Sequence, residues 1–391
     1  MDSLPLSGLT VVALEQAVAA PFATRQLADY GARVIKIERP GTGDFARHYD
    51  ETVHGLSSHF VWINRGKESL TLDLKSVAGQ DIVRRLMARA DILVQNLKPG
   101  ALERMGLGAE LLREQYPRLI ICSISGYGPD GPYRDKKAYD LLIQAESGLL
   151  SITGTPESPA KVGISVADIA AGMYALTGVL MAVVERQKTG RGTHIEVSML
   201  EALAEWMGFP LNYGHFSGRP PARTGPHHAT IAPYGPYPAR DGEVFVAVQN
   251  EREWQLFCRS VLGRDDMAQD ERFSTNSLRV TNREALNQAI SEAFARHSAA
   301  ELIQLLDRAQ IASARLNQLN EIWNHPQLRS RWAQVGTERG PVPQLRPPVN
   351  FPQAVSTMGA VPALGQHTWA ILKELGIPES DITAWEQDGT I

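Results

Sequence analysis

The stretch "LTVVALEQAVAAPFATRQLADYGARVIKIE" (9–38) decides the fold. It begins with a continuous apolar run at 9–15, passes through a helical segment at 21–31 that a glycine ends, and closes with a second apolar run at 32–38. A strand, a helix and a second strand in this order form a βαβ unit with parallel strands. The stretch therefore predicts an α/β protein.

The same alternation continues along the chain. We expect further strands at 69–75, 91–96, 119–125 and 193–200, and helices at 79–90 and around 108–116. Strands separated by helices predict a mostly parallel sheet. We assign this sheet to a large domain whose main segment is 1–215.

The composition changes after residue 210, where Pro, Gly, His and Tyr dominate as far as about 240. We interpret 216–325 as a smaller α+β domain with its entry linker, because a strand at 243–249 precedes a mainly helical segment. A Pro-rich return and a last helix at 367–376 assign 326–391 to the completion of the large domain. Two domains also suit a chain of 391 residues.

Charge and cysteine content indicate the compartment. The net charge is −4 and the sequence pI about 6.2, which argues against nucleic-acid and membrane partners. The first residues show no secretory signal pattern. Cys122 and Cys258 lie in apolar stretches, as free thiols of a reducing compartment do. We expect a cytoplasmic protein.

The most apolar segment follows a single carboxylate. Residues 169–184 carry no charge, which is short of the roughly 20 apolar residues needed to span a bilayer, so we expect a helix buried in a soluble core. Asp168 stands directly before this run. It could cap the helix, which is the ordinary role of such an aspartate, or act as a nucleophile. Local sequence does not decide between the two.

Cations recur where the predicted strands end. The first strand–helix turn, "LEQAVAAPF", lacks the G-x-G-x-x-G pattern of dinucleotide folds. The carboxyl ends of parallel strands line the ligand crevice, so basic residues there favour an anionic, nucleotide-like ligand. These residues are Arg39, Lys75, Lys98, Arg104, Lys136 and Lys137. No metal site is expected, since the only histidine pair, at 227–228, lacks further ligands at set spacing.

The chain resembles the class III CoA-transferases, the formyl-CoA transferase-like group that includes carnitine CoA-transferase and the sister α-methylacyl-CoA racemases. Five blocks carry the resemblance, and they span nearly the whole chain. They are "ADYGARVIKIERPGTGD" (28–44), "NLKPGALERMGLG" (96–108), "SISGYGPDGPY" (123–133), "VADIAAGMYALTGVLMAVVERQKTGRG" (166–192) and "LGQHTWAILKELG" (364–376).

The resemblance implies a fold and a set of site residues. Asp168 matches the family's catalytic nucleophile, and the fold is a Rossmann-like large domain with a smaller domain, in an interlocked homodimer. No tightly bound cofactor is implied, because coenzyme A is part of the substrate. The residues that match the family's CoA contacts are Arg39, Lys75, Asn96, Leu97, Arg104, Lys137 and Tyr139.

The implied reaction needs a carboxylate nucleophile. An aspartate with the ordinary pKa of about 3.9 is ionised at neutral pH and attacks a thioester without a base. The products are an acyl–aspartyl anhydride and then an aspartyl-CoA thioester, from which an acceptor carboxylate takes the CoA. Backbone N–H groups at the start of the long helix are candidate donors to the oxyanion.

Two departures bear on the substrate. The related racemases carry a histidine where this chain has Tyr139, which favours a transferase over a racemase. Formyl-CoA transferases carry His-x-Gln where we align Gln16-Ala17-Val18, and their glycine-rich loop is missing here. These differences from formyl-CoA transferases argue against formate and oxalate as substrates, so formyl-CoA:oxalate transfer is the second alternative, after the racemase.

A different segment, 223–248, takes the place of the glycine-rich loop. It resembles family members that use succinyl-CoA and a dicarboxylate of the itaconate, mesaconate, citramalate, malate or glutarate type. A second carboxylate needs cations or hydrogen-bond donors, or else the segment is a solvated loop with no such role. Candidate substrate contacts are Gln16, Arg47, Arg223, His227 and His228.

Overall fold

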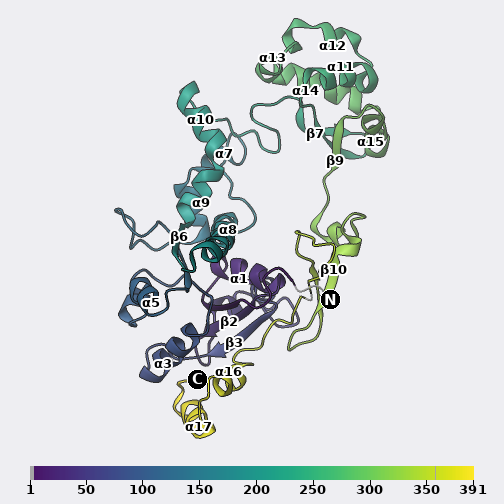
Figure 1. Cartoon of the computed structure of the whole chain (residues 1–391). Helices are drawn as coiled ribbons and strands as arrows, with labels where there is room; N and C mark the ends of the chain where they lie inside the picture. The colour runs from purple at the N-terminus through teal and green to yellow at the C-terminus, as the bar shows by residue number, and fades with distance from the viewer. Residues whose placement is uncertain (1–3, 357) are drawn as a thin grey trace. The chain divides into compact units, whose positions relative to one another are not determined.

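The computed structural model describes residues 4–356 and 358–391 and divides the chain into two compact units (Figure 1). The large unit comprises Met1–Ser147, Gly163–Met207 and Ser330–Ile391. The small unit comprises Gly148–Val162 and Gly208–Arg329.

The segment 148–162 belongs to the small unit, although its sequence suggested the large domain. Hydrogen bonds to the later loop hold it there. The Gly225 N–H donates to the Gly154 carbonyl, and the Arg223 guanidinium donates to three carbonyls of the segment. Such pairings join distant parts of the chain and leave no local signal in the sequence.

A six-stranded sheet forms the centre of the large unit. Its order is β3-β2-β1-β4-β5-β6, and every neighbouring pair is parallel, which confirms the α/β fold. The order reverses between β1 and β4, and parallel sheets bind ligands beside such a switch point. The strands are β1 (Thr10–Leu14), β2 (Arg33–Glu38), β3 (Lys67–Thr71), β4 (Ile92–Gln95), β5 (Ile120–Ser125) and β6 (His194–Ser198).

Helices connect these strands and cover the sheet. Apolar residues from β1 to β5 and from α3 form one buried core with residues of α16 and α17. The helices of the large unit are α1 (Ala19–Asp29), α2 (Ser58–Ile63), α3 (Val77–Met87), α4 (Ala101–Arg104), α5 (Ala109–Gln115), α6 (Asp140–Glu146), α8 (Val166–Thr189), α9 (Met199–Trp206), α16 (Thr368–Glu374) and α17 (Glu379–Asp388).

The C-terminal segment returns to the edge of this sheet. It contains the hairpin of β10 (Trp332–Val335) and β11 (Val342–Leu345), followed by α16 and α17, drawn in yellow near β3 in Figure 1. The His367 N–H donates to the Ser69 carbonyl, and the Asp73 N–H donates to the Thr390 carbonyl. The segment thereby completes the large unit.

The small unit has its own core. Alternate residues of β8 are buried against Trp254, Phe257 and Phe294, as a sheet with one covered face requires. Its strands are β7 (Tyr234–Ala239), β8 (Gly242–Ala247) and β9 (Ala312–Arg315), and its helices are α7 (Leu149–Ile152), α10 (Gly208–Ser217), α11 (Glu251–Leu256), α12 (Asp265–Gln269), α13 (Asn276–Thr281), α14 (Arg283–Phe294) and α15 (Ala299–Arg308).

The long helix α8 extends beyond the uncharged run into "ERQKT" at its C-terminal end. Within the described ranges it is the one helix whose length and hydropathy would suffice to cross a membrane. Core helices of soluble proteins share these properties, and 44% of its most apolar window is buried inside the protein. Its Gly172 side packs against α1.

Candidate active site

A cavity of about 760 Å³ opens at the switch point of the sheet. The loops after β1, β2, β3 and β4 line it, as the topology predicts. Seven residues selected from the sequence lie together in this lining: Gln16, Arg39, Lys75, Asn96, Leu97, Lys98 and Arg104. The cavity is large enough for a ligand of nucleotide size.

The basic residues around the cavity carry unneutralised charge. Arg39, Lys75, Lys98 and Arg104 are exposed, and in the described part of the chain none of them forms an ion pair. Of the four acidic residues of the lining, Asp73 has no ion pair within the ranges that the structure describes, and the other three are paired. Glu15 pairs with Lys67. Glu38 pairs with Arg47, and Asp44 pairs with Lys36. The free cations make the cavity suited to a phosphorylated ligand.

Asn96 holds the two central loops together. Its Oδ1 accepts from the Gln16 N–H at 2.9 Å, and its Nδ2 donates to the Gln16 carbonyl at 2.8 Å. The Asn96 side chain thus fixes the backbone after β1 across the switch point. Both polar atoms of the Asn96 side-chain amide are therefore bonded to the Gln16 backbone.

Lys137 and Tyr139 lie outside the lining of this cavity. Both stand in the loop between β5 and α6 and are exposed, with 62% of Tyr139 accessible to solvent. Tyr139 directly precedes α6, and it is close enough to Tyr49 to contribute to the raised pKa of the Tyr49 phenol. This position relates it to the start of α8 rather than to the cavity at the strand ends.

Asp140, rather than Asp168, caps the long helix. The Oδ1 of Asp140 accepts from the Ala167 N–H at 2.8 Å and from the Asp168 N–H at 3.4 Å. Ser165, at the N-cap position of α8, forms no side-chain cap bond. The capping role considered for Asp168 is therefore filled by another residue. The sequence suggested that backbone N–H groups at the start of α8 hold the oxyanion. The Ala167 and Asp168 N–H groups already donate to Asp140, so these two are not free for that role.

The Asp168 carboxylate faces the start of α1. Burial and then the charge of the nearby Asp140 raise its pKa, the Ala19 N–H lowers it, and the net result is a pKa of about 7. The expectation of an ordinary aspartate pKa is therefore wrong. The sequence could not reveal this, because Asp140 lies 28 residues away and Ala19 lies in another helix.

Gly172 sets the spacing between α1 and α8. A Cβ atom at this position would lie 2.7 Å from the Ala19 carbonyl oxygen and 3.0 Å from a ring carbon of Phe22. Only a residue without a side chain permits this approach. Because Asp168 stands one turn before Gly172, the same approach brings its carboxylate to the Ala19 N–H.

Tyr49 is a neighbour of Asp168 that the sequence did not single out. It follows the short 3-10 turn Phe45–His48, and burial raises its pKa to about 12 with contributions from Asp44 and Asp168. Its ring meets His59 edge-on with 5.3 Å between centroids. An aromatic residue just after the "ERPGTGD" block was the available signal, but a single tyrosine in a loop is not specific.

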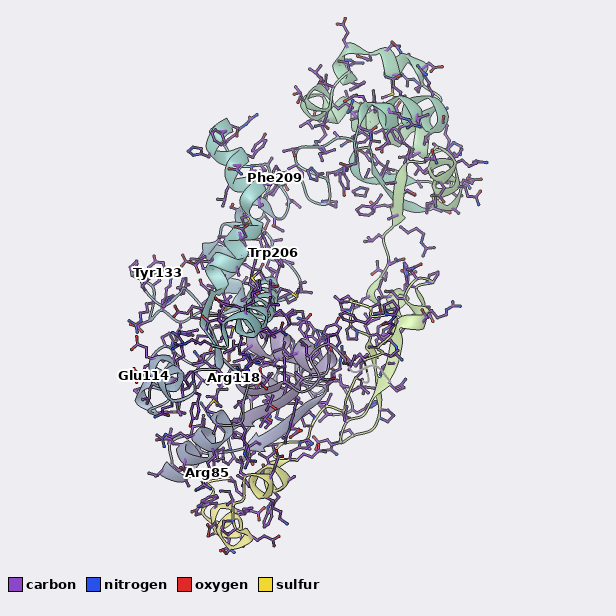
Figure 2. The ribbon with its side chains drawn as sticks, in the orientation of Figure 1. Arg85, Glu114, Arg118, Tyr133, Trp206 and Phe209 are labelled. Carbon is purple, nitrogen blue, oxygen red and sulfur yellow. The ribbon has the colours of Figure 1, made fainter. Side chains whose placement is uncertain are left out.

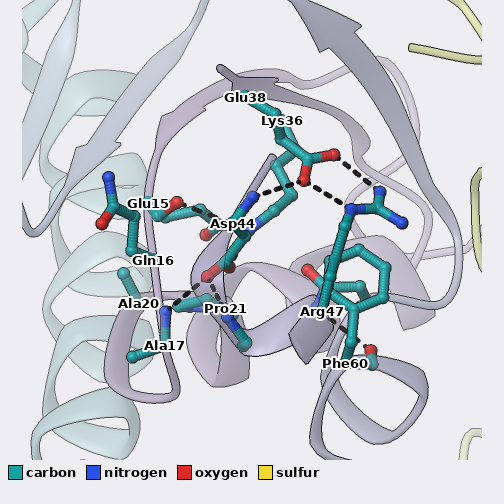
Figure 3. Close-up of polar contacts among 12 residues, drawn as sticks. Glu15, Gln16, Ala17, Ala20, Pro21, Lys36, Glu38, Asp44, Arg47 and Phe60 are labelled. Carbon is teal, nitrogen blue, oxygen red and sulfur yellow. Dashed lines mark hydrogen bonds and ion pairs between the residues drawn. The ribbon is translucent and has the colours of Figure 1, made fainter. Parts of the chain in front are cut away.

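Arg47 is engaged by its own domain. Its Nε and Nη2 donate to the two carboxylate oxygens of Glu38 at 2.8 Å each, and its guanidinium lies 3.7 Å from the centroid of the Phe60 ring (Figure 3). Burial opposes the charge of Glu38, but Arg47 outweighs burial and lowers the pKa of Glu38 to about 2. This pairing occupies the donors that a substrate carboxylate would need.

The remaining candidates belong to the small unit. Arg223 donates to the carbonyls of Thr155, Ser151 and Pro156 at 2.9 to 3.2 Å. Burial and then the charge of Arg283 lower the pKa of both His227 and His228, so both rings favour the neutral form.

Arg283 joins these histidines, although the sequence did not point to it. Its Nη2 donates to the His228 carbonyl at 2.8 Å. Among the described residues, its Nη1 and the Nδ1 of His227 are both buried without a hydrogen-bond partner. Arg283 lies outside the loop on which the sequence reasoning concentrated, which is why it was missed.

Comparison with known proteins gives concordant matches. The family model of CoA-transferase family III matches residues 6–368. A succinate–glutarate CoA-transferase of Agrobacterium fabrum is 35% identical over 97% of this chain and 98% of its own length. An acetyl-CoA:oxalate CoA-transferase of Acetobacter aceti is 33% identical over 96% of this chain and 97% of its own. The crystal structure of a CAIB/BAIF family protein from Brucella suis covers 96% of this chain and 100% of that one, with 34% identity and a TM-score of 0.83.

Proposed function

The chain belongs to CoA-transferase family III, and from this premise we propose that it moves CoA from succinyl-CoA or a related dicarboxylyl-CoA to a dicarboxylate acceptor through Asp168. One observation carries the role of Asp168. Asp140 already caps α8, which leaves the Asp168 carboxylate free of that task and held at the start of α1.

In this proposal Asp168 attacks the thioester carbonyl of the donor and releases CoA thiolate, which leaves an acyl–aspartyl anhydride. The thiolate then attacks the Asp168 carbonyl of the anhydride, which forms an aspartyl-CoA thioester and frees the donor acid. An acceptor carboxylate attacks this thioester and releases the thiolate again, leaving a new anhydride. Attack of the thiolate on the acceptor carbonyl gives the product acyl-CoA and regenerates Asp168.

The cavity at the strand ends is the proposed place of the CoA nucleotide. Arg39, Lys75 and Arg104 would pair with its phosphates, and the backbone near Asn96 and Leu97 would line it. Gln16 lines this cavity, and Ala19 bonds Asp168 three residues later. One short loop thus connects the proposed nucleotide site with the nucleophile. Lys137 and Tyr139 are proposed to contact the pantetheine part.

The raised pKa of Asp168 suits a dry site. Anhydrides hydrolyse readily, so water must be excluded, and the same burial makes the carboxylate less stable as an ion. Asp168 must be ionised to attack. We therefore expect the transfer rate to rise as pH increases through about 7.

The second carboxylate of the acceptor needs a partner when it leaves water. Arg223, His227 and His228 are the proposed set, and the unpaired Nη1 of Arg283 adds a fourth member. For Arg223 this role requires that it give up bonds to backbone carbonyls. Support for dicarboxylates as substrates comes from the matching succinate–glutarate transferase.

A panel of acceptors tests the substrate class. With succinyl-CoA as donor, dicarboxylates of four to six carbons should react at least about 10²-fold faster than butyrate, because butyrate forgoes two charge-assisted bonds. New acyl-CoA species are measured by mass spectrometry. Arg283→Met should slow the dicarboxylates while leaving butyrate unchanged. Equal rates for butyrate and dicarboxylates contradict the proposal, and preference for formate or oxalate supports the formyl-CoA:oxalate alternative.

A second assay tests the racemase alternative. Racemisation removes the α-proton on one face of the carbon and delivers a proton on the other, so it uses two groups, and Tyr139 takes the place of the racemase histidine. A 2-methylacyl-CoA incubated with the protein in deuterated water should keep its α-hydrogen. Steady deuterium incorporation would assign the chain to the racemase branch.

A further inference from the structure

The turn that precedes α1 has an unusual backbone. Ala17 adopts a φ of 62°, a left-handed conformation that residues with a side chain rarely occupy. Two residues later the Ala19 N–H approaches Asp168 and lowers the pKa of its carboxyl, at the place where Gly172 lets α8 come close to the Ala19 carbonyl. A strained conformation persists only where its surroundings hold it, so some contact must fix Ala17.

Asp44 supplies that contact (Figure 3). Its Oδ1 accepts from the Ala17 N–H at 3.1 Å and from the Ala46 N–H at 2.9 Å. Its Oδ2 pairs with the fully buried Lys36 at 2.8 Å, and its own N–H donates to Glu38 at 3.1 Å. Asp44 is itself buried, so it is fixed by partners on three sides.

Lys36 anchors this arrangement in the sheet. Burial opposes its charge, but Asp44 and Glu15 outweigh burial and raise its pKa. Glu15 in turn pairs with Lys67, whose pKa burial lowers to about 7. Glu15 directly follows β1, Lys36 lies within β2 and Lys67 begins β3, so these buried charges connect the turn at Ala17 to three neighbouring strands of the sheet.

We propose that Asp44 is a positioning residue for the reaction: by holding Ala17 in its left-handed turn, it directs the Ala19 N–H at the Asp168 carboxylate. The role rests on the proposed function, because it matters only if Asp168 reacts as an ion. A carboxylate that accepts an N–H bond is stabilised in its charged form. Loss of the turn should therefore leave Asp168 protonated at a pH where the wild type is ionised.

Asp44→Asn tests the proposal. An amide has only one oxygen, so it cannot accept from both the Ala17 N–H and Lys36. We expect the pKa of Asp168 to rise by about one unit and kcat at pH 7 to fall about fivefold, with KM for the CoA thioester within about twofold of wild type. The pKa is read from the carboxyl carbon of ¹³C-labelled aspartate by NMR, with the Asp168 signal assigned by its loss in Asp168→Asn.

Other charged groups bear on this measurement. Asp140 and the phenols of Tyr49 and Tyr139 face the Asp168 region, while Lys36 and Lys67 face Asp44. Tyr49 stays neutral over the range of the titration, because burial raises the pKa of its phenol to about 12. Lys67 has a pKa near that of Asp168, so the NMR signal of Asp168 itself is followed rather than activity alone.

Asp29→Asn is the matched control. Asp29 is buried to the same degree, with 2% exposure for both residues, and pairs with Arg25 and Arg65 instead of the turn. It should lower the melting temperature as Asp44→Asn does but leave the pKa of Asp168 unchanged. Equal pKa values for Asp168 in wild type and Asp44→Asn overturn the proposal.

A second variant pair covers the case in which Asp44→Asn does not fold. Ala17→Val leaves all the buried charges in place but disfavours the left-handed turn, whereas Ala17→Gly favours it. Only Ala17→Val should raise the pKa of Asp168, and an unchanged pKa in Ala17→Val contradicts the positioning role. Near-native turnover in Asp168→Asn would instead refute the proposed function, while the NMR result for Asp44 would stand by itself.

Discussion

Asp168 illustrates at the residue scale how a reactive group costs stability. Its pKa in the folded protein, about 7, lies above the unfolded value of 3.8. The folded state therefore binds more protons between these values, and the stability that protonated Asp168 contributes is lost as pH rises towards 7. Asp168→Asn should then be more stable than wild type at pH 8 by about 1–3 kcal/mol, since one pKa unit corresponds to about 1.4 kcal/mol.

The measurement is urea unfolding of both proteins at pH 4 and pH 8. Asp140 still caps α8 in the variant, so loss of the cap does not obscure the comparison. Near pH 4 the two free energies of unfolding should nearly coincide. A variant less stable than wild type at pH 8 would show that the Asp168 carboxylate contributes favourable contacts that we have not recognised.

The cations of the cavity carry a separate prediction. Single substitutions Arg39→Ala, Lys75→Ala and Arg104→Ala should each weaken CoA binding by about 1–3 kcal/mol, the scale of a charge-assisted hydrogen bond. Turnover at saturation should change much less, because these contacts bind ground and transition states alike. Isothermal titration with CoA measures the affinity.

Arg85→Ala is the control for these substitutions. Arg85, labelled in Figure 2, is an exposed arginine of α3 that lies outside the cavity lining, and among residues 4–356 and 358–391 its one ion pair is with Asp81. Its removal should leave CoA affinity unchanged. Unchanged affinity in all three cavity variants would place the nucleotide elsewhere.

Residues of the site differed in how far the sequence revealed them. Cations at strand ends were predictable, because parallel topology gathers those ends at one edge. Asp140 and Ala19 were not, since their contacts with Asp168 depend on tertiary packing between separate helices. Arg47 was selected from the sequence as a substrate contact, but in the structure it is paired with the buried Glu38, and nothing in the sequence indicated this pairing.

At the scale of the element, the approach of α1 and α8 has a specific requirement. Gly172→Ala places a Cβ within 2.7 Å of the Ala19 carbonyl, so the helices must separate. We expect a loss of about 1–3 kcal/mol in stability from overpacking and a larger fractional loss of transfer, because the Asp168 contact lengthens. Urea unfolding and the transfer assay measure the two effects.

Gly178→Ala serves as the control on the same helix. A Cβ there would meet the Ile195 side chain, whose two methyl groups lie at 3.1 and 3.8 Å and can adjust. The change should retain transfer and can gain the helix propensity of alanine, up to about 1 kcal/mol. Equal losses of transfer activity in Gly172→Ala and Gly178→Ala would contradict a specific requirement for the close approach of α1 and α8.

Element boundaries show where local patterns stop being informative. The third strand was expected at 69–75, but β3 runs from Lys67 to Thr71. Lys67 is buried inside the strand because Glu15 neutralises it, which an apolar pattern cannot anticipate. The strand ends early because Asp73 bonds to Thr390 in the C-terminal segment. Periodicity gave the six strands of the sheet, and distant partners determined their limits.

For the whole molecule we propose self-association, as the family resemblance implies. Large apolar side chains are exposed along the late part of α8, including Met181 at 65% and Val184 at 52%. Trp206 and Phe209, labelled in Figure 2, are about half exposed on α9 and α10. Met181 and Val184 stand one turn apart on α8, and monomeric soluble proteins seldom expose large contiguous apolar patches. The cytoplasmic location predicted from the sequence is a separate proposal.

Light scattering after size-exclusion chromatography tests this prediction. The mass should be twice that of the 42.9 kDa chain at micromolar concentration. Met181→Glu combined with Val184→Glu should shift the protein towards monomer, because burial of unpaired charge is costly. The paired substitutions Lys188→Glu, in the last turn of α8, and Arg191→Glu, just beyond its C-cap Gly190, serve as the control. A wild-type monomer would contradict the proposal.

The central claim is that Asp168 becomes covalently bonded to CoA, and mass spectrometry tests it most directly. The protein is mixed with succinyl-CoA without acceptor, quenched in acid and digested. The account predicts a peptide containing Asp168 whose mass is increased by that of CoA less one water, and its absence in Asp168→Asn, which should also lack transfer. An unmodified Asp168 peptide together with near-native transfer by Asp168→Asn would contradict the account.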